Sequence, residues 1–239
     1  MAADGRPAGH GSPPSGLRGG GLPSPSDIAG GRGLSAEESG LRVAKNPACT
    51  LVVDDHPAVR AGLVALLEAE CGLRLLPAAT GVREALAIAR RETPDIALLD
   101  VSLGDGDGLS LCLELKRLST PPPGVLLYTA STDPLLGAKA RLVGADGLIA
   151  KTARASELRS AIQTALQGRG NPPAFDRELL RAITARLAPE TLSLVGLRLE
   201  GTPIAGTAEV LGLDEEGVIS RIRALLRRLG DDSAAATVG

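Results

Sequence analysis

The chain has 239 residues, of which 44% are hydrophobic and 1% aromatic, and its formal net charge is −2 at pH 7. This length allows one or two domains with a hydrophobic core of ordinary size. The charge balance argues against a strongly basic coat for nucleic acid, although it leaves room for a small basic patch.

Three cysteines at irregular spacing fit neither a disulfide framework nor a zinc site. We therefore expect Cys49, Cys71 and Cys112 to be reduced thiols in the core of an intracellular protein. No apolar run reaches the length of a membrane span, and the N-terminus lacks a signal pattern. These features predict a cytoplasmic protein with no membrane partner.

Residues 1–47 are rich in Gly, Pro and Ser and lack apolar periodicity. Such a segment cannot bury enough surface to offset its ordering entropy, so we expect a disordered N-terminal extension. We interpret it as a linker or a mis-assigned start rather than as a functional tail.

From Cys49 onward, the chain alternates five times between a short apolar run and an amphipathic stretch. Strands are predicted at residues 49–55, 73–79, 95–100, 124–130 and 147–151. Helices are predicted at residues 58–70, 81–91, 109–118, 133–143 and 156–167. Nearly continuous apolar strands between amphipathic helices predict a parallel sheet covered on both faces.

The breaker cluster at residues 168–173 predicts a domain boundary. Four helical stretches without a strand signal follow, at residues 176–187, 190–200, 203–211 and 215–229. Asp214 precedes the last stretch and is a good N-cap. Short helices joined by tight glycine turns predict a helix-turn-helix.

Polar side chains follow four of the predicted strands. Asp54 and Asp55 end the first strand, Asp100 ends the third, Thr129 ends the fourth and Lys151 follows the fifth. Because ligands of an open parallel sheet bind at the carboxyl ends of its strands, we expect these side chains to share one pocket. Three converging carboxylates need a cation, and oxygen ligands suit Mg²⁺.

A carboxylate beside such a metal can attack a phosphoryl donor. Lys151 would offset charge on the phosphoryl oxygens, and the Thr129 hydroxyl would donate a hydrogen bond to one of them. A single Asp at a strand end is usually a helix cap or a solvated loop residue. Five such residues at the ends of four strands favour a shared site.

The motifs VVDDHPAVRAGLVALL, ALLDVSLGDGDGLSLC, YTAS and GADGLIAK resemble a two-component response regulator of the LuxR/NarL type. The resemblance covers about residues 49–232. It implies an α/β receiver with a flavodoxin-like five-stranded parallel sheet of order 2-1-3-4-5, followed by a small all-α helix-turn-helix domain. The implied segments are the extension 1–47, a receiver 48–168, a linker 169–175, an effector 176–232 and a tail 233–239.

By this resemblance Asp100 is the phosphoacceptor and takes a phosphoryl group from a sensor histidine kinase. Asp54, Asp55, Asp100 and the backbone carbonyl of Ser102 hold Mg²⁺. Thr129 and Lys151 contact the phosphoryl group. Receivers usually carry an aromatic residue three positions before this lysine, where the chain has Leu148. The signal then travels through aliphatic repacking, or the coupling is weaker.

Two further features near the acids have competing interpretations. Asp105 and Asp107 could suggest a calcium loop, but the rest of such a loop is missing, so we expect a solvated turn. His56 could suggest a phosphorylated histidine, but its place before Pro57 favours a role at the start of a helix.

The C-terminal stretch resembles the LuxR-type helix-turn-helix, with a recognition helix at about residues 215–229. Candidate contacts to promoter DNA are Ser220, Arg221, Arg223, Arg227 and Arg228. Ile219 stands where Lys is common, and residues 171–239 hold 8 Arg and no Lys against 10 Asp plus Glu, a net charge of −2. We expect weak DNA binding by a monomer and stronger binding by a homodimer on two half-sites.

These observations favour a phosphorylated regulator of transcription that is not an enzyme with a substrate of its own. One alternative is a regulator whose degenerate helix-turn-helix docks a protein instead of DNA. Another is a phosphohydrolase of the haloacid-dehalogenase type, which usually has a second Asp where this chain has Ser102.

Overall fold

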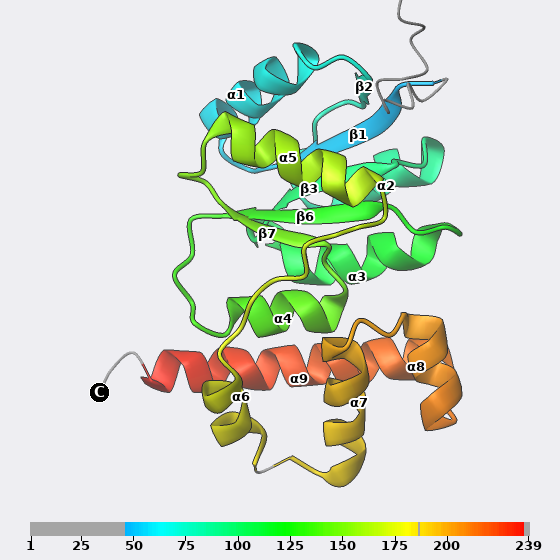
Figure 1. Ribbon diagram of the computed structural model, residues 1–239, viewed down its shortest axis with the longest axis vertical. Helices are drawn as coiled ribbons and strands as arrows, with labels where there is room; N and C mark the ends of the chain where they lie inside the picture. The colour runs from blue at the N-terminus through cyan, green and yellow to red at the C-terminus, as the bar shows by residue number, and fades with distance from the viewer. Residues whose placement is uncertain (1–45, 186, 237–239) are drawn as a thin grey trace, which may run out of the picture. The chain divides into compact units, whose positions relative to one another are not determined.

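The computed structural model describes residues 46–185 and 187–236, all within one compact unit, Val43–Gly239 (Figure 1). The extension expected at residues 1–47 therefore lies almost wholly outside the described residues. No described helix is both long enough and apolar enough to cross a membrane.

A five-stranded parallel sheet forms the centre of the first half of this unit. Its strand order is β2-β1-β3-β6-β7, which confirms the expected order 2-1-3-4-5. The strands are β1 (Ala48–Val53), β2 (Leu73–Leu75), β3 (Ile96–Asp100), β6 (Gly124–Thr129) and β7 (Gly147–Ala150). β7 is one edge of the sheet, so the chain after it is paired on one side.

Five helices cover the sheet, with α1 and α5 on one face and α2, α3 and α4 on the other (Figure 1). They are α1 (Pro57–Glu68), α2 (Val82–Arg91), α3 (Gly108–Leu118), α4 (Leu136–Val143) and α5 (Ala155–Leu166). In β1, Leu51 and Val53 join the core on the α2–α4 face, and Val52 joins the core under α1 and α5. Burial on both faces is the reason why the strands are apolar without alternation.

A two-stranded hairpin that the sequence pattern did not predict follows β3. It consists of β4 (Ser102–Leu103) and β5 (Gly106–Asp107). The expected turn is present and its Asp105 and Asp107 are exposed, but both also cap helices. Asp105 accepts hydrogen bonds from the backbone N–H groups of Val82 and Arg83 at 2.7 and 3.2 Å, and Asp107 caps α3 through the N–H of Ser110 at 2.8 Å.

The cap at α2 explains a glycine. Gly81 precedes the helix and has no side chain to cap it, so the carboxylate of Asp105 does so from the hairpin. A Cβ at Gly81 would lie 2.2 Å from an oxygen of Asp105. These bonds to backbone N–H groups lower the pKa of Asp105 below its ordinary value, because they stabilise the carboxylate.

Four helices make up the second half of the unit. They are α6 (Arg177–Thr184), α7 (Pro189–Leu199), α8 (Ile204–Leu211) and α9 (Glu215–Ala236). Gly212 ends α8 with a left-handed φ of 62°, and Asp214 accepts a hydrogen bond from the N–H of Gly217 at 2.8 Å. α9 continues to Ala236, beyond the expected end at residue 229.

The three cysteines differ in exposure. Cys112 is buried in α3, Cys49 is half-buried and Cys71 is exposed. The expectation of three core thiols is therefore wrong for Cys71, which lies in the turn between α1 and β2. Burial raises the pKa of Cys112 to about 12, since the thiolate would lose its hydration.

Candidate functional site

Asp54, Asp55, His56 and Asp100 lie together at the carboxyl ends of β1 and β3. Each offers one ligand atom, and these atoms all lie within 4.8 Å of one another. Asp54 is fully buried and Asp100 is 4% exposed. Adjacent parallel strands bring these groups together because β1 and β3 pair directly, with Val53 opposite Leu99.

Lys151 reaches this cluster from the turn after β7. Its Nζ lies 2.7 Å from Asp100 Oδ2 and 2.8 Å from Asp54 Oδ2. Burial alone would lower the pKa of Lys151, but the hydrogen bonds and charges of Asp100 and Asp54 outweigh it and raise the pKa. The ammonium is therefore charged at neutral pH and balances one of the three carboxylates.

The cluster has buried oxygen atoms that its own side chains do not fully satisfy. Asp54 Oδ2 and Asp55 Oδ1 are buried, and among the described residues each has a single nitrogen neighbour, Lys151 Nζ at 2.8 Å and His56 Nδ1 at 2.7 Å, with no further donor. Buried charges need compensation by opposite charge. A set of carboxylate oxygens with incomplete compensation fits a hard divalent cation such as Mg²⁺.

His56 occupies the position before α1, as expected. His56 is the N-cap residue, with an extended ψ of 112°, and Pro57 takes the first helical position. The backbone N–H of His56 donates to Asp54 Oδ1 at 2.8 Å. Its imidazole is 66% exposed and leans toward Asp55, with Nδ1 2.7 Å from Asp55 Oδ1. The sequence pattern did not predict this contact with the acids.

Two further residues that the sequence predicted for the site, Thr129 and Ser102, have different hydrogen-bond partners. Thr129 is buried, and its hydroxyl accepts a hydrogen bond from the N–H of Ser131 at 2.9 Å. The N–H of Ser102 donates to Asp100 Oδ1 at 3.2 Å. The backbone of Ser102 thus contacts the carboxylate of Asp100, and Thr129 follows Tyr128, the register partner of Asp100.

The expected DNA contacts all lie on α9, but they do not share one environment. Ser220, Arg221, Arg227 and Arg228 are exposed. Arg223 is half-buried and forms an ion pair with Glu114 of α3. In this structure Arg223 is therefore paired with the sheet-containing half of the chain.

The same side of α9 packs toward the sheet-containing half. Ile219, one turn before Arg223, is 0% exposed and belongs to the core cluster that also contains residues of α4 and α7. Glu216 of α9 accepts a hydrogen bond from Arg117 of α3 at 2.8 Å. The face of α9 that carries Glu216, Ile219 and Arg223 is thus in contact with the rest of the unit.

Arg198 of α7 adds a buried cation to this contact. It is 3% exposed, and its Nε donates to the carbonyl oxygen of Leu142, near the C-terminus of α4, at 2.8 Å. A second nitrogen donates to the carbonyl of Thr202. Burial lowers the pKa of Arg198, and the negative end of the α4 dipole favours a cation at this place.

Known proteins share both halves of this chain. The family described as the response regulator receiver domain matches residues 50–163. The DNA-binding transcriptional activator DevR/DosR of Mycobacterium tuberculosis is 34% identical over 192 residues, which cover 75% of this chain and 87% of that protein. This chain is a response regulator of the LuxR/NarL type.

Other relatives match in part. The response regulator UvrY of Escherichia coli is 33% identical over 118 residues, 49% of this chain and 54% of that protein. The structure of the RcsB–DNA complex aligns with 77% of this chain and 93% of its own, with a TM-score of 0.51 and 22% identity, which shows a shared fold.

Membership of this family decides between the interpretations of the acidic cluster. The cluster of Asp54, Asp55 and Asp100 is typical of the magnesium site of receivers. The phosphohydrolase alternative is wrong, because response regulators are not enzymes with a substrate of their own. The sequence pattern missed the Asp105 cap, the buried Arg198 and the pairing of Arg223, since each depends on residues far apart in the chain.

Proposed function

We propose that this response regulator accepts a phosphoryl group on Asp100 from a sensor histidine kinase in the cytoplasm and controls transcription through its C-terminal helices. The receiver would span residues 48–168, the linker 169–175, the effector 176–232 and the tail 233–239. The observation that carries the proposal is the position of the Lys151 ammonium, 2.7 Å from Asp100 and 2.8 Å from Asp54.

Asp54, Asp55, Asp100 and the carbonyl of Ser102 would hold Mg²⁺, which supplies positive charge beside the phosphoryl oxygens. In the transfer, an oxygen of Asp100 forms a bond to phosphorus, and the bond from phosphorus to the kinase histidine nitrogen breaks with its electron pair staying on nitrogen. Lys151 offsets negative charge on the transferred group. The Thr129 hydroxyl, whose oxygen accepts the N–H of Ser131, would donate its own hydrogen to a phosphoryl oxygen.

The proposal is tested by incubating the full chain with a small phosphodonor and Mg²⁺. We expect one acyl phosphate per chain in the wild type and none in Asp100→Asn. Asp107→Asn is a matched control, because Asp107 is the next carboxylate but one in the same loop and Asn caps a helix about as well as Asp. Equal labelling of the wild type and Asp100→Asn would overturn the assignment.

For the output, we propose that a homodimer binds promoter DNA through α9 after its contact with the receiver is released. The exposed donors Ser220, Arg221, Arg227 and Arg228 would contact phosphates, and Arg223 would join them when it leaves Glu114. The DNA binding named for DevR/DosR and for the RcsB complex supports this output. Each arginine that contacts a phosphate would add to the salt dependence of DNA binding.

Two observations favour a second candidate, in which the C-terminal helices dock a protein instead. Ile219 is fully buried, and residues 171–239 carry a net charge of −2, which weakens attraction to phosphates. DNA binding by phosphorylated protein at low salt separates the two outputs. Salt-sensitive binding supports transcriptional output, and its complete absence supports the docking module.

A further inference from the structure

Lys151 is held by two successive residues of β6. Its N–H donates to the carbonyl oxygen of Thr129 at 2.7 Å, which extends the pairing of β6 with β7 by one residue. Its own carbonyl oxygen accepts a hydrogen bond from the phenol of Tyr128 at 3.1 Å. Both the N–H and the carbonyl of Lys151 are thus hydrogen-bonded to β6.

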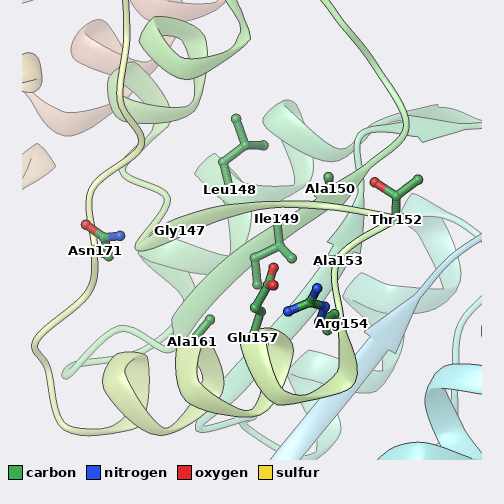
Figure 2. A pocket seen from close by; sticks show the side chains of 10 residues that line it. All are labelled: Gly147, Leu148, Ile149, Ala150, Thr152, Ala153, Arg154, Glu157, Ala161 and Asn171. Carbon is green, nitrogen blue, oxygen red and sulfur yellow. The ribbon is translucent and has the colours of Figure 1, made fainter.

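The opposite side of this segment lacks a neighbouring strand. β7 is an edge of the sheet, and the residues on either side of Lys151, Ala150 and Thr152, line an open cavity of about 580 Å³ together with Ala153 (Figure 2). Packing from the cavity side therefore does little to hold the turn. The phenol of Tyr128 acts from the sheet side, where it is half-buried.

The hydroxyl of Tyr128 reaches from β6 to this turn across the length of its ring. Tyr128 is the single tyrosine of the chain, and its ring packs against the core between the sheet and α1 and α5. Tyr128 is the register partner of Asp100 and lies on the α1/α5 side of the sheet, whereas its neighbour Thr129 faces the other side. The hydrogen bond that Tyr128 makes goes to the backbone of Lys151 and not to a carboxylate of the acidic cluster.

We propose that Tyr128 is a positioning residue, which holds the turn after β7 so that the Lys151 ammonium reaches Asp100 and Asp54. The inference rests on the proposed phosphoryl transfer to Asp100. Loss of the phenol hydroxyl leaves the ring in the core and the lysine in the sequence, but it releases the carbonyl of Lys151. The ammonium then spends less time on the carboxylates.

The test compares Tyr128→Phe, Lys151→Ala and the double variant as full chains with phosphoramidate and Mg²⁺. We expect Tyr128→Phe to lower the phosphorylation rate about two- to tenfold, the range that one hydrogen bond of this kind supports. In the Lys151→Ala background the same substitution should have no further effect, since it acts through the lysine. Thr164→Val is the matched control, because it removes a hydroxyl bonded to a carbonyl within α5 at 2.7 Å.

Amide hydrogen exchange provides a readout that does not need phosphorylation. We expect the amides of Lys151 and Ala153 to exchange about two- to tenfold faster in Tyr128→Phe and unchanged in Thr164→Val. An equal rate loss in both backgrounds, or unchanged exchange at these amides, would overturn the positioning role. Absence of labelling in the wild type would overturn the phosphoacceptor assignment instead, and the exchange result would still decide the role of Tyr128.

Discussion

Replacement of Ile219 by lysine tests whether the contact between α9 and the receiver half controls access to DNA. Ile219 is 0% exposed, and Arg223, one turn later on the same side of α9, pairs with Glu114 of α3. A lysine at this position has the residue type that is common in LuxR-type recognition helices. It cannot stay in the closed contact without burying its ammonium.

Two free energies decide whether the contact opens. Opening exposes the surface that the isoleucine side chain covers in the wild type, a loss of about 2 kcal/mol of apolar burial. Keeping the lysine buried and neutral at pH 7 costs about 5 kcal/mol, because its ordinary pKa of about 10.4 must fall by about 3.4 units at 1.36 kcal/mol each. A closed contact that has to absorb such a penalty should open, while the other buried side chains of α9, Val218, Ile222, Leu225 and Leu229, are unchanged by the substitution.

The assay is small-angle scattering and DNA binding at low salt, both without a phosphodonor. We expect Ile219→Lys to have a larger radius of gyration than the wild type and to bind DNA more tightly. Ala224→Lys is the control, because it adds the same charge at an exposed position of the same helix. A radius and a DNA affinity equal to those of Ala224→Lys would refute the reasoning.

Two other predictions concern the hairpin and the thiols. Asp105→Ala should lower Tm at pH 7, because the Asp105 carboxylate caps α2 and its pKa in the folded protein lies below the ordinary value of 3.8. The difference in Tm from the wild type should vanish as the pH falls through that folded pKa. A difference that persists in acid would contradict the cap. With a thiol reagent at neutral pH, Cys71 should react first and Cys112 only after unfolding, because Cys112 is buried and its pKa is raised to about 12; peptide mapping that finds native Cys112 labelled as fast as Cys71 would exclude that burial.

Much of the receiver fold follows from local pattern. Five apolar runs became five parallel strands, because strands buried on both faces have no polar alternation. The helix expected from Asp133 instead begins at Leu136, since the Asp133 carboxylate accepts the N–H of Leu135 and holds the preceding turn. Such side-chain bonds compete with the first helical turn and leave no periodic signal.

The acidic cluster was predictable for a related reason. Asp54, Asp55 and Asp100 end strands that are neighbours in the sheet, so strand order alone brings them together. The contact of α9 with α3 was not predictable, because it joins Glu114 to Arg223 across 109 positions of the chain. Sequence showed Ile219 as an odd residue for a DNA-reading helix, and only the fold shows that it is buried.

The most direct test of the central claim is peptide mapping by mass spectrometry after incubation of the full chain with phosphoramidate and Mg²⁺. The account predicts one phosphoryl group, on the carboxylate of Asp100, that forms only when the divalent ion is present. A phosphoryl group on any other residue of the wild type, or equal labelling in the presence of a metal chelator, would contradict it.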